Sequence, residues 1–151
     1  MSMSTGVCAQ GMSPVTAGIH DPPAVSARVR HTIPARQLQA LASQRLGDAS
    51  VSRLLLPDLK RLLGGRFDEF KASMADEQPL RMQGQVLVGE GVVPGTLGYR
   101  GAFFLLGDRG EMLAVLKSGH HGTTIERFGS LDLLKDRAAL HAYQEFVGID
   151  E

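Results

Sequence analysis

The sequence has one cysteine and no tryptophan, and both shortages exclude kinds of site. A single cysteine, Cys8, cannot form an internal disulfide framework or a zinc site with four cysteine ligands. It also lies close to the N-terminus, where we do not expect a positioned nucleophile. Because only two tyrosines accompany the missing tryptophan, we expect no stacking surface for single-stranded nucleic acid.

A net charge is also lacking. Lys plus Arg and Asp plus Glu each number 16 among the 151 residues, and no run of basic residues is longer than a pair. Proteins that bind nucleic acid usually carry an excess of basic charge, which neutralises phosphates. The sequence therefore predicts no nucleic-acid partner.

Long apolar runs are absent too. No stretch approaches the roughly 18 residues of a transmembrane helix, and the N-terminus lacks the basic and apolar regions of a signal peptide. We expect no membrane span and, by default, a cytoplasmic protein. A chain whose signal peptide had been removed would give the same pattern.

Residues 1–31 have the composition of a disordered tail. Ser, Thr, Gly, Ala and Pro dominate there, and Pro22-Pro23 interrupts both helix and central strand. The plain interpretation is an unstructured tail before a single α+β domain over 32–151. The alternative is an export leader, because Ser-rich starts with few charges are typical of substrates of injection-type bacterial secretion.

Helical spacing of apolar residues predicts three helices before Pro79. The first runs from Thr32 to Leu46, and Gly47 ends it. In the second, Pro57 either kinks the helix or begins a new one. The third covers 67–74.

After Pro79 the period becomes that of strands. Short connections between the strands indicate antiparallel pairing and argue against parallel βαβ units. Strands are expected at 82–88, 99–106, 112–116 and 123–128. Ser130 is expected to cap a final helix with Leu131, Leu134, Ala138 and Ala142 on one face. The sequence thus predicts an α+β fold in which N-terminal helices precede a roughly four-stranded antiparallel meander, closed by a C-terminal helix.

His120 and His121 are the first candidates for catalysis, because histidine transfers protons near neutral pH. Adjacent side chains in an extended segment point in opposite directions, so these imidazoles would not converge on one ion. A solvated hairpin loop is the plainer interpretation, and His141 with Glu145 has the spacing of a surface pair on a helix. No phosphate-binding loop or hydrolase motif occurs. We predict no catalytic residue, metal or cofactor.

The segment 89–98 is the best candidate for binding. It contains four glycines and Pro94, and it is long for a hairpin connection. Apolar residues on a protruding loop suit insertion into a partner's cleft, although they could equally fold back onto the sheet. The predicted partner-binding residues are Glu90, Val92, Val93, Pro94, Leu97, Tyr99 and Arg100.

The order of segments around this loop is also informative. The run Gln85 to Val88 (QVLV) leads into the loop with its central proline, which returns through Arg100 to Leu105 (RGAFFL). A tight polar turn then gives Glu111 to Leu116 (EMLAVL), and a helix closes the chain. From Gln85 to about Gly148 the chain in this way resembles the bacterial inhibitors of vertebrate lysozyme.

That resemblance implies a shared fold and a binding loop at the same place. The loop of the family plugs the lysozyme active site, is pinned by a disulfide and presents a histidine. In this chain Val93 and Pro94 occupy the corresponding positions, so the resemblance extends to the loop's position rather than to its chemistry.

The leading hypothesis is a non-enzymatic protein-binding module of bacterial type, inhibitor or immunity-like, whose partner is another protein held by the 89–98 loop. The second is a secreted or injected effector with the tail as its leader. A third is a secretion chaperone, or a small-molecule carrier, that dimerises through an apolar sheet. An enzyme using His120 or His121 comes last.

Overall fold

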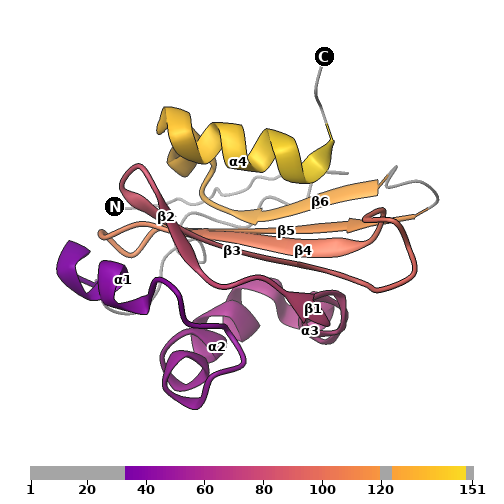
Figure 1. Ribbon diagram of the computed structural model, residues 1–151, viewed down its shortest axis with the longest axis horizontal. Helices are drawn as coiled ribbons and strands as arrows, with labels where there is room; N and C mark the ends of the chain where they lie inside the picture. Colours follow the sequence, from indigo (N-terminus) through magenta and orange to yellow (C-terminus); the bar gives the residue numbers. More distant parts are fainter. Residues whose placement is uncertain (1–32, 120–123, 149–151) are drawn as a thin grey trace, which may run out of the picture.

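The computed structural model describes residues 33–119 and 124–148 (Figure 1). The predicted tail 1–31 and the His120-His121 pair lie outside these ranges. The helices are α1 (Ala35–Leu41), α2 (Ala49–Leu63), η3 (Gly64–Arg66), α3 (Phe67–Ser73), η5 (Leu131–Lys135) and α4 (Arg137–Val147). The strands are β1 (Asp76–Glu77), β2 (Arg81–Gln83), β3 (Val86–Val92), β4 (Gly101–Leu106), β5 (Met112–Ser118) and β6 (Thr124–Gly129).

The sheet confirms the predicted α+β fold and has more strands than expected. It is six-stranded, with the order β1-β3-β4-β5-β6, and β2 also pairs with β3. Every pairing is antiparallel. Because β1 and β2 pair with different parts of β3, they form together one edge of the sheet that is interrupted between Gln78 and Leu80.

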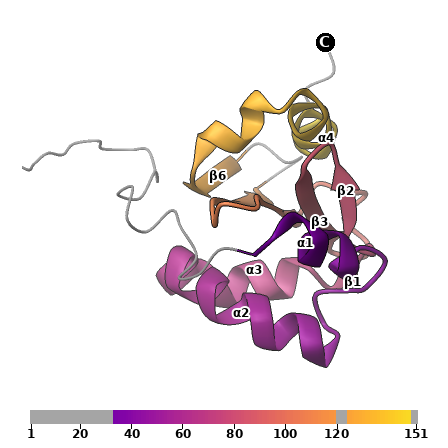
Figure 2. The same cartoon turned by 90° about the vertical axis from the view of Figure 1, so that its left-hand side faces the viewer.

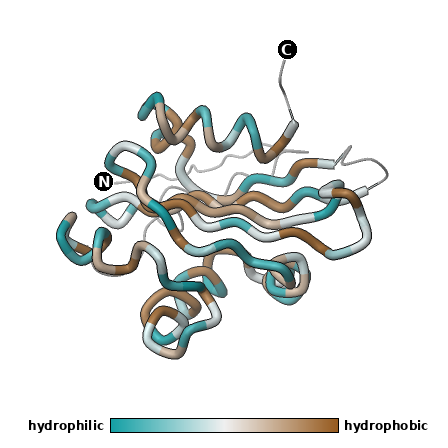
Figure 3. The backbone as a smooth tube through the Cα atoms, viewed as in Figure 1, coloured by the Kyte–Doolittle hydropathy of each residue, from teal (hydrophilic) through white to brown (hydrophobic). Residues whose placement is uncertain are grey.

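Helices cover both faces of this sheet. Figures 1 and 2 show α4 on one face and α1, α2 and α3 on the other. Phe104 and Leu106 belong to the core beneath α1–α3, whereas Phe103 and Leu105 pack beneath α4. The double burial explains why β4 and the first part of β5 are apolar at nearly every position, as the brown central strands of Figure 3 show. In the described residues, the apolar side chains on both faces of β4 are therefore covered by helices.

The predicted first helix is too long, because α1 ends at Leu41. Ser43 adopts a positive φ of 77°, which is incompatible with a continuing α-helix. Its N–H donates to the carbonyl of Leu80 at 2.7 Å, so a tertiary contact replaces the next helical turn. Pro57, by contrast, lies inside the continuous helix α2 and does not begin a new one.

The predicted strand 82–88 is wrong, since it is two strands joined by a turn. Gly84, with φ of 64°, separates β2 from β3. β3 then continues through Gly89 and Gly91 to Val92, where a loop was expected. A Cβ atom at Gly89 would lie 2.3 Å from the Phe104 ring, so this glycine permits close packing in a strand.

The final helix also differs from its prediction. Ser130 caps only the short helix η5, by accepting from the N–H of Asp132 at 3.3 Å. The chain leaves the helical conformation at Asp136, which caps α4. The interruption shifts the buried face, so the residues of α4 that face the sheet are Ala139, Ala142, Tyr143 and Phe146. Of the predicted face, Ala142 alone is among the buried residues of α4.

No helix in the two described ranges is both long and apolar enough to cross a membrane.

Candidate functional site

The connection from Val93 to Arg100 joins β3 to β4 and swings out beyond the end of the sheet (right-hand side of Figure 1). We call it the β3–β4 loop. It begins later than predicted, because Glu90 and Val92 belong to strand β3. The connection still exceeds the roughly two to five residues of a usual hairpin loop.

Hydrogen bonds within the β3–β4 loop fix its conformation. The N–H of Val93 donates to the carbonyl of Arg100 at 2.9 Å and closes the base. Above it, the N–H of Thr96 reaches the carbonyl of Val93 at 3.3 Å, and the N–H of Tyr99 reaches that of Thr96 at 3.0 Å. The Thr96 hydroxyl adds a 2.7 Å bond to the Val93 carbonyl. The loop is thus a pair of successive turns rather than an open excursion.

An ion pair fastens the base of the loop to the helical layer. The Arg100 guanidinium lies 2.6 Å from the Glu69 carboxylate on α3, and both side chains are partly exposed. Arg100 therefore has a positioning role, and its charge is already paired before any partner arrives.

Some apolar side chains of the loop protrude into solvent, and others fold back towards the sheet, so each of the two predicted alternatives holds for part of the loop. Leu97 is 90% exposed and Tyr99 39%, and Pro94 is exposed as well. Val92 and Val93 are half-buried, so the stem of the loop folds back while its tip protrudes. The tip, at Leu97, carries the apolar surface that could contact a partner.

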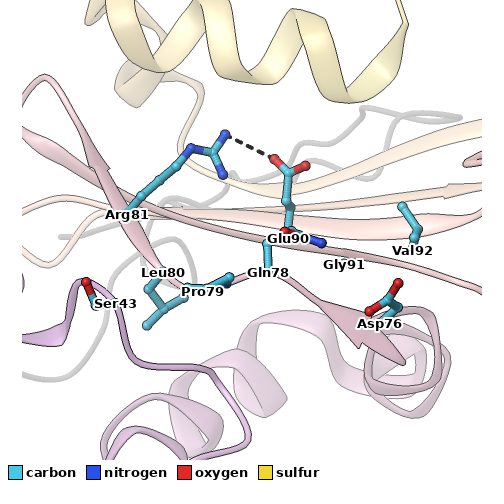
Figure 4. A pocket seen from close by; sticks show the side chains of 9 residues that line it. All are labelled: Ser43, Asp76, Gln78, Pro79, Leu80, Arg81, Glu90, Gly91 and Val92. Carbon is cyan, nitrogen blue, oxygen red and sulfur yellow. Dashed lines mark hydrogen bonds and ion pairs between the residues drawn. The ribbon is translucent and has the colours of Figure 1, made fainter.

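A groove adjoins the stem of the loop (Figure 4). It occupies about 540 Å³. The groove lies where Pro79 interrupts the edge of the sheet. At this point the backbone of Leu80 forms hydrogen bonds with the segment before α2 and not with β3. The N–H of Leu80 donates to the Gln44 carbonyl at 2.6 Å. The lining residues are Ser43, Asp76, Gln78, Pro79, Leu80, Arg81, Glu90, Gly91 and Val92.

The sequence prediction missed this groove. Pro79 was a usable signal, since a proline between short strands marks an interrupted edge. The neighbouring strand β1, which shows where the edge resumes, is only Asp76–Glu77 and is too short to give a periodicity.

Two charged side chains that line the groove, Arg81 and Glu90, are paired with each other. Glu90, a predicted partner-binding residue, accepts from Arg81 at 3.2 Å (dashed line in Figure 4). Burial lowers the pKa of Lys117, and the Glu90 carboxylate acts in the opposite direction. Lys117 also donates to the carbonyl of Phe146 and lies 4.7 Å from the centre of its ring. Glu90 is therefore engaged inside the protein and is less suited to a partner than Leu97.

Within 33–119 and 124–148, no three His, Cys, Asp or Glu side chains gather closely enough to hold a metal ion. His141 pairs with Glu145 at 3.2 Å, and both are exposed on α4, as their spacing predicts.

Comparisons of the chain with protein-family models, curated proteins and solved structures gave no match.

Proposed function

We propose that this chain is a non-enzymatic protein-binding module, inhibitor or immunity-like, that docks on another protein through the β3–β4 loop and the adjoining edge of the sheet. The observation that carries the proposal is a connection that is closed at its base by hydrogen bonds and leaves Leu97 90% exposed at its tip. Ordering a loop before binding reduces the entropy cost of association.

The surrounding surface supports the same function. The half-buried stem residues Val92 and Val93 support the tip, while polar and charged groups of the groove lie beside them. An apolar centre with a polar surround is the usual anatomy of a protein interface. The resemblance to lysozyme inhibitors suggests the same role for a loop at this position and makes vertebrate lysozyme a convenient first partner to test.

The test compares the intact chain with a variant in which the residues between Val93 and Arg100 are replaced by Asn-Gly. Val93 and Arg100 already form the hydrogen-bonded pair at the base, and Asn-Gly closes such a pair in a two-residue hairpin turn. The shortened variant should therefore keep its fold and its melting temperature.

Both forms are immobilised and exposed to bacterial lysate and, separately, to purified vertebrate lysozyme. The proposal predicts a protein that the intact chain retains and the shortened variant does not. Equal retention by both would contradict a role for the loop. Failure to bind lysozyme would remove that target and leave the lysate comparison to decide the function.

A further inference from the structure

Leu97 combines two properties that oppose stability. Its side chain is 90% exposed, so it gains almost nothing from burial. Its φ of 55° lies in the left-handed region, where a bulky side chain is crowded against its own backbone. Asn or Gly would fit this backbone better, and a polar residue would fit the exposure better.

The neighbouring glycines show that the loop uses the left-handed conformation repeatedly. Gly95 and Gly98 have φ of 84° and 80°, as glycine readily permits. Leu97 stands between them as one of only two residues other than glycine with positive φ in the described part of the chain; Ser43 is the other. The strain at Ser43 has a structural reason, because its N–H bonds the Leu80 carbonyl.

The position of Leu97 is imposed by the rest of the loop. It lies within the turn that the 3.0 Å bond from Tyr99 N–H to the Thr96 carbonyl closes. The ion pair of Arg100 with Glu69 holds the base. The leucine is thus presented in a defined direction, and strained backbone of this kind is often found at functional sites.

We propose that Leu97 is the anchor of the interface, and that it inserts into an apolar pocket about one leucine side chain deep on a different, folded protein. This inference rests on the proposed function and deepens it, because it assigns the contact to one side chain and names the chemistry of the receiving surface. A few well-packed side chains at the centre of an interface carry most of the affinity when the contacts around them exclude water.

Other occupants fit less well. A lipid surface would require several apolar side chains with basic residues beside them. In the loop, Leu97 is the one large apolar side chain that is almost fully exposed, since Tyr99 is only 39% exposed, and the nearby Arg100 is paired. In a second copy of the chain, the groove beside the loop carries Asp76, Arg81 and Glu90. Charged groups of that kind would be desolvated by a leucine.

The experiment uses the protein that the intact chain captures, purified, and measures its Kd for the wild type and for single variants of the full chain. Leu97→Met keeps an apolar side chain of similar volume. Leu97→Asn removes it while suiting the left-handed backbone, so a failure to fold is not expected. Leu131→Asn is the matched control, because Leu131 is a large apolar residue that is 38% exposed outside the loop.

Leu97→Asn should weaken binding by about 10- to 100-fold, which corresponds to the loss of one buried apolar side chain. The Kd of Leu97→Met should stay within about threefold of the wild-type Kd, and the Kd of Leu131→Asn should equal the wild-type value. A photo-reactive leucine analogue at position 97 should cross-link to apolar residues that line a pocket of the captured protein.

Wild-type affinity in Leu97→Asn, with binding still lost in the Asn-Gly variant, would overturn the anchor and leave the proposed function standing. Absence of any loop-dependent partner would overturn both. The wild type could also co-sediment with phosphatidylcholine–phosphatidylglycerol vesicles, or self-associate on ultracentrifugation. If either behaviour disappeared in Leu97→Asn, the side chain would belong to a membrane contact or to a contact with a second copy, and the inference would be contradicted.

Discussion

The Arg100 guanidinium and the Glu69 carboxylate lie 2.6 Å apart, and this ion pair joins the base of the β3–β4 loop to helix α3. Arg100 is the last residue before β4, whereas Glu69 lies in the first turn of α3. The pair therefore ties the loop to the helical layer on one face of the sheet.

Substituting Arg100 by Met should loosen the loop more than it destabilises the protein. A partly exposed ion pair contributes about 1 kcal/mol or less to the free energy of unfolding, so the melting temperature should change little. Hydrogen exchange at the Thr96 and Tyr99 amides, which bond within the loop, should accelerate. Glu69→Gln should give the same result, and unchanged exchange in both variants would show that the ion pair does not hold the loop.

Leu97→Asn should raise the free energy of unfolding by about 1 kcal/mol, because asparagine tolerates the left-handed backbone that strains leucine. Urea denaturation measures the change. Leu97→Val should have the opposite effect, since a β-branched side chain is the most crowded at positive φ. A loss of stability in the asparagine variant would mean that Leu97 is not strained.

Asp136 fastens helix α4 to the turn between β2 and β3. Its carboxylate accepts from the N–H groups of Ala138 and Ala139 at 2.9 and 3.1 Å and from that of Gln85 at 3.1 Å. Asp136→Ala should lower the free energy of unfolding by about 1 to 2 kcal/mol, as the loss of a helix cap does. Ser130→Ala is the control. It should lower the free energy of unfolding by a smaller amount, because the Ser130 hydroxyl accepts one hydrogen bond, of 3.3 Å, from the N–H of Asp132.

The same carboxylate should make stability depend on acid pH. The hydrogen bond from Gln85 is the main cause that holds the pKa of Asp136 below its ordinary value of 3.8. A folded-state pKa below the unfolded one means that the contribution is present above pH 3.8 and disappears as the pH falls through the folded value. Asp136→Asn keeps an oxygen acceptor without titrating at this position. Denaturant titrations at pH 6 and about pH 3 should therefore show that the free energy of unfolding falls more in the wild type than in Asp136→Asn. An equal fall in both proteins would contradict this role of the Asp136 carboxylate.

Gly89→Ala should lower the free energy of unfolding by about 1 to 3 kcal/mol through overpacking. The added Cβ would approach Phe104 to 2.3 Å and Leu80 to 2.8 Å. Gly65→Ala is the matched control, because no atom lies within 4 Å of its added Cβ. The melting temperatures of Gly89→Ala and Gly65→Ala give the comparison. Equal melting temperatures would show that Gly89 is not closely packed.

Local patterns predicted much of the fold. The runs that became β4 and β5 were predicted as strands because they are apolar at nearly every position, and the structure buries both faces of β4 and of the first part of β5. The order of helices, antiparallel sheet and final helix also follows from periodicity. Two of the errors arose at Ser43 and Gly89, where contacts with Leu80 and Phe104, distant in the sequence, decide the conformation.

The β3–β4 loop was predicted near its observed position, but only part of its detail was predicted. The sequence indicated a long connection with apolar residues, and Leu97 proved to be exposed whereas Val93 is half-buried. The left-handed backbone at Leu97 follows from the turn in which it lies. The pairing of Arg100 with Glu69 joins residues on separate elements, and no pattern along the chain reports such a contact.

The most direct test of the proposed function is the retention of a protein from bacterial lysate by the intact chain and by the variant with Asn-Gly between Val93 and Arg100. We predict a protein that binds the intact chain alone, while both forms unfold at the same temperature. Retention of the same proteins by both forms would contradict a binding role for the β3–β4 loop.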